Sequence, residues 1–255
     1  MINDAAVSFS APTVRLACGD CWALLQAEPS ESVDLIYLDP PFNTGRCMRG
    51  RAGSFDDRFE SLRGYLGFLE PRLAECRRIL KPTGSILVHG DWRTSHRVRC
   101  LLDDMFGPDR FVNHLVWSYG LGGSSPRTFA RKHDDILFYA KSDDYYFEAP
   151  RVPATSMRMR GLTKKATDVL DIPAINNLAR ERTGYPTQKP LQLLTMLVQA
   201  CSPQGGTVLD PCCGSGTTLV AALANGRSAI GFDVNPQAIE IAERRTTGNL
   251  RAAAG

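Results

Sequence analysis

The stretch Val33 to Gly45, which reads V-D-L-I-Y-L-D-P-P-F-N-T-G, decides the fold of this chain. Its first six residues, Val33 to Leu38, are mostly aliphatic or aromatic, which favours a strand buried on both faces of a parallel sheet. Asp39 ends this run, and the two prolines that follow stiffen the backbone into an extended turn. We therefore expect a carboxylate at the carboxyl end of a central strand, where open α/β sheets bind ligands.

The tetrapeptide Asp39-Pro40-Pro41-Phe42 suits a flat heterocycle that carries an exocyclic amine. The Asp39 carboxylate and the Pro40 carbonyl are acceptors for the two amine hydrogens, and Phe42 offers a face for stacking. A simpler interpretation is that Asp39 caps a turn and Phe42 packs in the core. The four residues resemble the catalytic tetrapeptide of amino-methyltransferases that use S-adenosylmethionine.

Composition limits the class of protein and its partners. With 255 residues, 43% of them hydrophobic and 22% charged, the chain suits one large α/β domain with an insertion. The net charge of +3 means that any nucleic-acid surface must be local. No apolar run reaches the length of a membrane span, and the polar residues Met1 to Ser10 lack a signal-peptide pattern, so we expect a cytoplasmic protein without membrane contact.

The eight cysteines raise the question of a metal site. Cys18 and Cys21 have the C-x-x-C spacing of zinc or redox sites, and Cys212 and Cys213 are adjacent. No second C-x-x-C or pair of histidines completes the usual zinc set. We therefore expect reduced, buried thiols and no metal.

Apolar patterning predicts seven strands with helices between them. The strands are expected at Val14 to Ala17, Val33 to Leu38, Ser85 to His89, Phe111 to Ser118, Asp135 to Ala140, Thr207 to Leu209 and Ser228 to Phe232. Pro71 is expected to break or restart the helix between Glu60 and Leu80. Lys81 to Gly84 reads as a turn, and Asp91 is a candidate cap for the next helix.

The second half of the chain contains the pattern of a nucleoside site. The predicted strand Thr207 to Leu209 leads into a glycine-rich turn and a helix, and Asp233 ends the next strand. Leu219 stands where a dinucleotide motif needs its third glycine, and no P-loop lysine follows, which disfavours a pyrophosphate. Asp210 would instead face a positive group such as an α-ammonium. Asp233 could accept the two ribose hydroxyls, and Asp20 the adenine amine.

Taken together, the motifs resemble those of the β group of S-adenosylmethionine-dependent DNA amino-methyltransferases of the adenine-N6 type. The matching stretches are D-P-P-F, D-P-C-C-G-S-G-T-T from Asp210, F-D-V-N from Phe232 and Y-P-T-Q-K-P from Tyr185. This family usually has Phe where Cys212 stands. The resemblance implies a circularly permuted, Rossmann-like α/β fold whose seven-stranded sheet is mostly parallel, with Asp135 to Ala140 antiparallel and helices on both faces.

The resemblance also implies roles for residues and segments. The catalytic residues would be Asp39, Pro40, Pro41 and Phe42. The cofactor would contact Asp20, Cys21, Asp39, Thr187, Lys189, Asp210, Cys212, Gly214, Ser215, Gly216, Thr217, Asp233 and Val234. Residues 1–140 would form the catalytic half of the domain, 141–185 a small target-recognition insertion, and 186–255 the cofactor-binding half.

Basic residues gather in three segments that we expect to be loops. Gly45 to Gly53 is glycine-rich and suggests a mobile cationic loop, and Tyr119 to Lys132 is rich in Gly and Ser. The third segment, Arg151 to Lys165, has no acidic residue and lies within Lys141 to Tyr185, which has no sustained period. The candidates for contact with double-stranded DNA are Arg46, Arg49, Arg127, Arg131, Lys132, Arg151, Arg158, Arg160, Lys164 and Lys165. The alternative is that these are ordinary solvated loops.

Several functional alternatives stay open at this point. Cytosine-N4 methyltransferases usually carry Ser in place of Asp39, so adenine is favoured over cytosine. An RNA base or a protein amide is a weaker alternative, because related enzymes acting on those have another motif order. The chain could also be a non-catalytic DNA-binding subunit. The resemblance makes a homodimer and a cognate restriction endonuclease candidate partners, although no residue demonstrates either.

Overall fold

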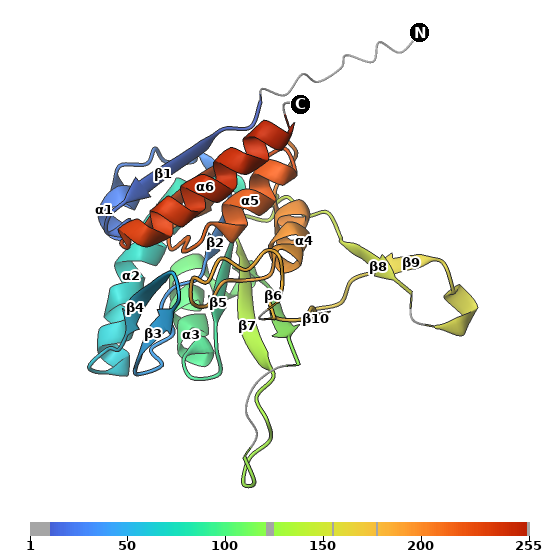
Figure 1. The fold of residues 1–255 in the computed structure, drawn as a ribbon, viewed down its shortest axis with the longest axis horizontal. Coiled ribbons are helices and arrows are strands. Elements are labelled where there is room, and N and C mark those ends of the chain that lie inside the picture. Colours follow the sequence, from blue (N-terminus) through green and yellow to red (C-terminus); the bar gives the residue numbers. More distant parts are fainter. Residues whose placement is uncertain (1–10, 121–124, 155, 177, 254–255) are drawn as a thin grey trace.

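A large twisted sheet forms the centre of the molecule, and helices lie against it (Figure 1). The structure is a computed structural model that describes residues 11–120, 125–154, 156–176 and 178–253. The main sheet has the order β1-β12-β11-β2-β5-β7-β6-β10. Its strands are β1 (Val14–Cys18), β2 (Val33–Leu38), β5 (Leu80–Gly90), β6 (Phe111–Ser118), β7 (His133–Ala140), β10 (Val169–Asp171), β11 (Thr207–Asp210) and β12 (Ser228–Asp233). The expectation about Met1 to Ser10 lies outside the described residues.

The strand directions confirm the mostly parallel α/β fold. β1, β12, β11, β2 and β5 run parallel, and β7 is antiparallel to both β5 and β6. The predicted count of seven strands is wrong, because β10 pairs in parallel with β6 as an eighth strand. β10 has only three residues and one buried side chain, Leu170, so its local pattern is too short to reveal it.

Strand β2 is buried over its whole length and has a parallel neighbour on each side. Leu35 and Tyr37 pack in the cluster that includes residues of α4 (Leu191–Cys201) and α5 (Thr217–Ala224). Ile36 and Leu38 pack on the opposite face with α2 (Leu62–Ile79) and α3 (Ser95–Phe106). The alternation confirms the predicted strand and the helices on both faces.

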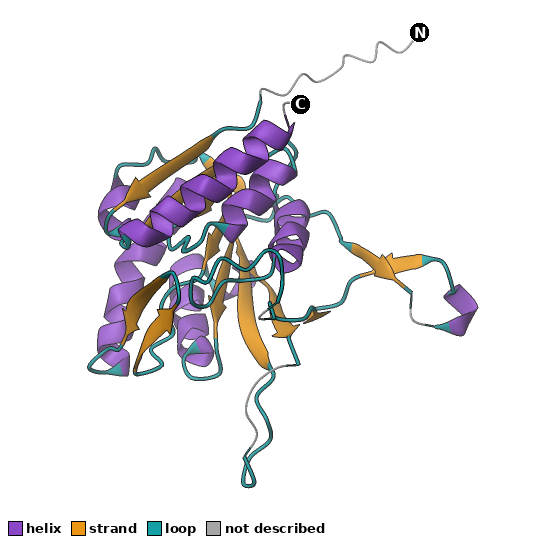
Figure 2. Cartoon of the chain, viewed as in Figure 1, coloured by secondary structure: helices purple, strands orange, loops and turns teal. Residues whose placement is uncertain are grey.

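Two further helices complete these layers (Figure 2). The short α1 (Cys21–Gln26) packs against α2, and α6 (Pro236–Ala253) packs against α5 and β1. Two single turns of 3-10 helix lie at Pro108–Arg110 and Met157–Met159. No helix among the described residues is long and apolar enough to cross a membrane.

The glycine-rich stretch Gly45 to Gly53 is not the loop that we expected. It forms most of an antiparallel hairpin of β3 (Arg46–Gly50) and β4 (Gly53–Asp57). The two glycines at its tip allow close packing: a Cβ on Gly50 would lie 2.4 Å from the carbonyl oxygen of Gly184. The Ala52 amide donates a hydrogen bond to that same oxygen. The hairpin is therefore held against the segment that precedes α4.

Three smaller expectations also need correction. Helix α2 continues through Pro71, because its buried face, including Leu69 and Leu73, keeps both halves against the sheet. Lys81 to Gly84 lies within β5, where a register shift opposite β2 absorbs the extra residues. Asp91 is not the helix cap: α3 begins after Thr94, and the Asp91 carboxylate binds Arg93 instead.

The segment 141–185 contributes to two parts of the molecule. β8 (Arg151–Pro153) and β9 (Thr163–Lys165) form a small antiparallel hairpin that projects away from the main sheet (Figure 1). Farther along, β10 joins the main sheet and Ile172 is buried in its core. Residues 125–132, which precede β7, project in a different direction from the β8–β9 hairpin (Figure 1).

Candidate active site

A cavity of about 800 Å³ lies at the carboxyl ends of β1, β2, β11 and β12. It is lined by all four candidate catalytic residues, Asp39 to Phe42. Every candidate cofactor residue except Gly216 also lines it. The fold thus brings together residues from positions 20 to 234, because the ends of parallel strands meet at one edge of a sheet.

The turn after β2 is fixed by a buried acid. Asn43 adopts a positive φ of 58°, which reverses the chain directly after Phe42. Asp57, at the end of the β3–β4 hairpin and 3% exposed, accepts hydrogen bonds from the backbone amides of Asn43 and Thr44 at 2.7 and 3.1 Å. The Thr44 hydroxyl donates a further bond to the same carboxylate. These bonds hold the D-P-P-F turn in place.

The two oxygens of the Asp39 carboxylate have different surroundings. Oδ2 pairs with Nζ of Lys189 at 2.5 Å. Oδ1 is buried and has no hydrogen-bond partner, and Nδ1 of His89 lies 3.8 Å away. A buried acceptor without a donor is costly. An amine hydrogen of a bound base would relieve that cost.

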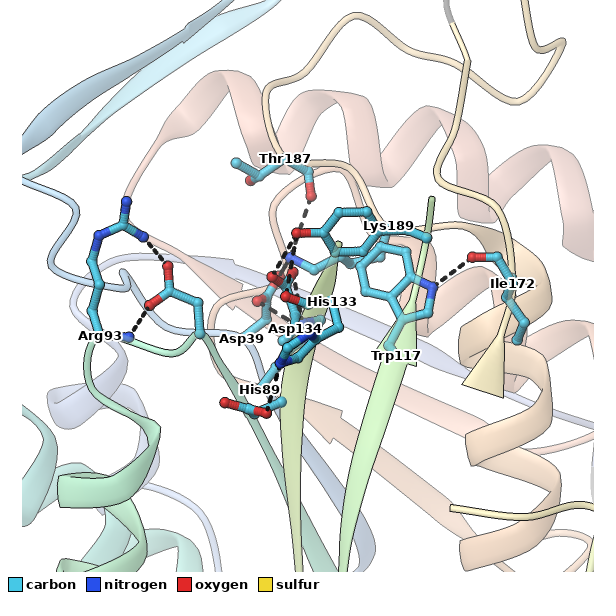
Figure 3. Close-up of polar contacts among 12 residues, drawn as sticks. Asp39, His89, Arg93, Trp117, His133, Asp134, Ile172, Thr187 and Lys189 are labelled. Atoms are coloured by element: carbon cyan, nitrogen blue, oxygen red, sulfur yellow. Dashed lines mark hydrogen bonds and ion pairs between the residues drawn. The ribbon is translucent and has the colours of Figure 1, made fainter. Parts of the chain in front are cut away.

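A hydrogen-bonded network lies beside Asp39 (Figure 3). Nδ1 of His89 is 2.6 Å from the Tyr37 hydroxyl, and Nε2 is 3.3 Å from Oδ2 of Asp134. The Tyr119 hydroxyl donates to the other oxygen of Asp134 at 3.2 Å. Burial opposes ionisation of Asp134, yet the bond to His89 and nearby positive charge keep its pKa below the usual value. Burial also raises the pKa of Tyr37.

Aromatic rings form the wall next to this network. The Phe42 and His89 ring centroids are 5.5 Å apart, and His89 meets Trp117 edge-on at 5.7 Å. The Trp117 indole is fixed by a hydrogen bond of 2.7 Å to the carbonyl of Ile172 (Figure 3). Nζ of Lys189 lies 5.3 Å from the Phe42 centroid. Sequence reasoning missed His89, Trp117 and Tyr119, although His89 lies near the end of β5, the neighbour of β2, and the other two lie at the end of β6.

The glycine-rich turn after β11 surrounds a buried carboxylate. Asp210 accepts hydrogen bonds from the Thr218 hydroxyl at 2.6 Å and from the Cys212 amide at 3.1 Å. Burial raises the pKa of Asp210 to about 7. Gly214 and Gly216 have positive φ angles of 50° and 76°, a conformation that favours glycine. The turn therefore exposes backbone to the cavity while keeping Asp210 inside it.

Asp233 and Asp20 line the cavity, and their carboxylates also accept hydrogen bonds from backbone amides. Asp233 accepts bonds from the amides of Gly214 at 2.9 Å and Asn235 at 2.8 Å, and burial raises its pKa. Asp20 accepts the Trp22 amide at the start of α1. Its two oxygens also bind the guanidinium of Arg72 at 2.8 and 3.0 Å, a partner that the sequence did not predict.

Cys18 and Cys21, the two cysteines of the C-x-x-C motif, have different surroundings. Cys18 is exposed, whereas Cys21 is buried and faces Cys212 across the cavity wall. Among residues 11–120, 125–154, 156–176 and 178–253, no three His, Cys, Asp or Glu side chains form a candidate metal site.

The segment before α4 closes one side of the cavity. Thr187 has a positive φ of 59°, and its carbonyl lies 3.4 Å from Nζ of Lys189 (Figure 3). Tyr185 packs closely on Gly53 and Gly214, and burial raises its pKa. The side chain of Gln188 ties this segment to Thr183 and to the carbonyl of Glu181. The turn thereby directs Lys189 at Asp39.

None of the ten candidate DNA-binding residues lines the cavity. Arg46 and Arg49 lie on β3, and Arg131 stacks over Trp92 at 3.8 Å. Arg151 is held by hydrogen bonds to Thr163 across the β8–β9 hairpin. The others lie in the β6–β7 loop (Arg127, Lys132) or in and between β8 and β9 (Arg158, Arg160, Lys164, Lys165).

The sequence of this chain is similar to those of known DNA methyltransferases. A family model described as DNA methylase, N6_N4_Mtase, matches residues 33–244. Type II methyltransferase M.HpaI from Haemophilus parainfluenzae is 32% identical over 238 residues, which cover 91% of this chain and 73% of that protein. DNA adenine methyltransferase YhdJ from Escherichia coli K12 is 32% identical over 244 residues, covering 89% and 80%.

Two solved structures show the same fold. The cytosine-N4-specific PvuII DNA methyltransferase superposes with a TM-score of 0.71 at 17% identity, covering 95% of this chain and 93% of that one. The complex of M1.HpyAVI with SAM gives a TM-score of 0.65 at 20% identity, covering 91% and 98%.

Proposed function

Because the chain belongs to the DNA methylase family, we propose that it transfers a methyl group from S-adenosylmethionine to the exocyclic N6 of adenine in duplex DNA. The observation that carries the proposal is the buried, unpartnered Oδ1 of Asp39, which lies in the same cavity as the glycine-rich turn. An acceptor in that position matches an amine hydrogen.

The cavity residues fit the proposed cofactor. Asp210 is a buried carboxylate for its α-ammonium group, and Asp233 can accept ribose hydroxyls through its remaining lone pairs. Asp20 is already bound to Arg72, so a contact with the adenine amine would share its carboxylate. When bound, S-adenosylmethionine supplies an electrophilic methyl group on a sulfonium.

The residues around Asp39 would prepare the amine for attack. Oδ1 of Asp39 and the carbonyl of Pro40 accept the two amine hydrogens, which draws the nitrogen toward tetrahedral geometry. Lys189 fixes the other carboxylate oxygen, so the acceptor is held in one orientation. The network of Tyr37, His89 and Asp134 supports the wall behind it.

The aromatic residues suit a base turned out of the duplex. Phe42 offers a face for stacking, which would offset part of the unstacking cost of a few kcal/mol. Trp117 and Tyr119 line the same cavity. Adenine is favoured over cytosine because Asp39 stands where cytosine-N4 enzymes usually carry Ser.

Three basic segments support contact with DNA phosphates. They are the β3–β4 hairpin, the β6–β7 loop and the β8–β9 hairpin with its connection, and two of them project from the sheet (Figure 1). We propose that residues 141–185 act as the target-recognition region, since the projecting hairpin carries Arg158, Arg160 and Lys165 on its exposed surface. The homodimer and the cognate restriction endonuclease stay predictions from the resemblance.

Nucleoside analysis tests the proposed reaction. Unmethylated duplex DNA, RNA and a protein extract are each incubated with the chain and isotopically labelled S-adenosylmethionine, then digested and analysed by mass spectrometry. We expect labelled N6-methyladenine from DNA alone. Labelled N4-methylcytosine, label in RNA or protein, or no label in any substrate would contradict the proposal.

A titration with S-adenosylmethionine separates an enzyme from a non-catalytic subunit. We expect saturable binding of one cofactor per chain, because the cavity contains acids suited to both its ammonium and its ribose. A chain that binds DNA without binding the cofactor would instead fit the subunit alternative.

A further inference from the structure

Two thiols from distant parts of the chain meet in the wall of the cofactor cavity. Cys21 begins α1 just after β1, and Cys212 follows β11. β1 and β11 both pair with β12, so the two cysteines converge beside the end of that strand. The side chains of Cys21 and Cys212 are neighbours, each the largest influence on the pKa of the other, and both residues line the cavity.

A buried arginine distinguishes Cys21 from the other thiols. Nε of Arg72 lies 3.2 Å from the Cys21 sulfur, and the same guanidinium binds Asp20 at 2.8 Å. The hydrogen bond from Cys212 and the charge of Arg72 outweigh burial and the opposing charge of Asp20, and lower the pKa of Cys21 to about 7. Burial instead raises the pKa of Cys201 to about 12 and that of Cys76 even higher. Among the buried thiols, Cys21 is therefore the one that loses its proton most readily.

We propose that Cys21 and Cys212 form an oxidative modification site for hydrogen peroxide, and that their disulfide prevents binding of the cofactor. This inference rests on the proposed function only for the identity of that cofactor. All eight cysteines lie among the described residues, and none of them is paired in a disulfide.

The chemistry needs only the peroxide as oxidant. The Cys21 thiolate attacks one peroxide oxygen, the O–O bond breaks, and the departing hydroxide takes up a proton to become water. The Cys212 sulfur, after losing its proton, then attacks the sulfenic sulfur of Cys21, and the second oxygen leaves as water. Two thiols lose two electrons and two protons in total, and one peroxide becomes two waters.

The disulfide would disturb both ends of the nucleoside site. A covalent S–S bond of roughly 2 Å is shorter than any non-bonded contact between two sulfur atoms, so forming it draws Cys21 and Cys212 closer together. The Cys212 amide is a hydrogen-bond donor to Asp210, and Cys21 follows Asp20 directly. The Arg72 contact with the Cys21 thiolate is lost as well.

Peptide mapping after peroxide treatment identifies the linked pair. The chain is treated with hydrogen peroxide, with or without saturating S-adenosylmethionine, and digested without a reductant. We expect a linked pair of peptides containing Cys21 and Cys212, formed more slowly when the cofactor is present. The link should persist in the matched controls Cys18→Ser and Cys213→Ser and be absent in Cys21→Ser and Cys212→Ser.

Cofactor affinity is measured on the same samples by calorimetry. We expect the oxidised chain to bind S-adenosylmethionine about tenfold more weakly or worse, with recovery after dithiothreitol. A Cys18–Cys21 link, no link, or a link that leaves affinity unchanged would overturn the inference. If untreated protein fails to bind the cofactor, the proposed function fails, whereas the peptide map still decides whether this thiol pair reacts.

Discussion

Lys189 and Asp39, which are 150 positions apart in the sequence, form an ion pair with 2.5 Å between Nζ and Oδ2. The pair joins the turn after β2 to the turn before α4, so it links the two halves of the site. Both side chains are largely buried, at 10% and 17% exposure. This contact leaves Oδ1 of Asp39 as the oxygen available to a substrate.

Lys189→Gln should lower the free energy of unfolding by about 3 kcal/mol, because it leaves a buried carboxylate without its charged partner. The double variant Asp39→Asn with Lys189→Gln should lose less free energy of unfolding than the two single variants lose in total. Denaturant unfolding of the four proteins gives a coupling energy, for which we expect about 1–3 kcal/mol. A value near zero would show that the ion pair does not stabilise the site.

Cofactor binding should tighten as pH rises toward 7. Burial raises the pKa of Asp210 to about 7, so the free protein holds a proton there at lower pH. The ammonium group of bound S-adenosylmethionine favours the ionised carboxylate, so binding releases this proton. Below pH 7 the affinity for the cofactor should therefore rise by up to tenfold per pH unit. Calorimetry between pH 5.5 and about 8 measures this dependence.

Asp210→Asn is the control for that pH series. Its affinity should be weaker near pH 8 and should lose the contribution of this group to the pH dependence. Equal slopes for the two proteins would assign the dependence to another group, such as Asp233, whose pKa burial also raises.

DNA binding should depend on the β8–β9 hairpin. If Arg158 contacts a phosphate, Arg158→Gln should reduce the slope of log K against log salt by roughly 0.9, and Lys164→Gln should behave similarly. Fluorescence anisotropy at several salt concentrations measures the slope. Arg63→Gln, a substitution of an exposed residue on α2, is the matched control. Unchanged slopes in the hairpin variants would restore the interpretation of solvated loops.

Gly50→Ala should loosen the β3–β4 hairpin. Its Cβ would meet the backbone oxygen of Gly184 at 2.4 Å, so the hairpin must move from the segment that positions Lys189. We expect a loss of about 1–3 kcal/mol in stability, together with weaker cofactor binding. Gly67→Ala on α2 has no atom within 4 Å of its added Cβ and should not weaken binding. Equal affinity for Gly50→Ala and wild type would mean that the hairpin does not shape the cavity.

Much of the sheet could be predicted from sequence because its strands are continuous apolar runs. Val33 to Leu38 is buried on both faces, so its composition alone identifies it. The β3–β4 hairpin could not be predicted in that way. In the local sequence Gly50 and Gly53 favour a loop, but close contacts with residues 184–186, far away in the sequence, require them in the hairpin.

The candidate site was predictable where a motif placed an acid directly after a strand, as for Asp39, Asp210 and Asp233. His89 and Asp134 had no such motif, and their relation to Asp39 depends on the order of β2, β5 and β7 in the sheet. Arg72 lies on a helix whose local sequence gives no sign of its contact with Asp20 and Cys21. These relationships follow from tertiary packing.

The central claim is that Asp39 accepts a hydrogen of the target amine, and a comparison of wild type with Asp39→Ala tests it most directly. Methyl transfer to duplex DNA and calorimetric binding of S-adenosylmethionine are measured for both proteins, with Asp56→Ala, an exposed neighbour of the same cavity, as the control. We predict that Asp39→Ala loses turnover by about 10²-fold or more while it still binds the cofactor. N6-methyladenine formed by Asp39→Ala at the wild-type rate would contradict the account.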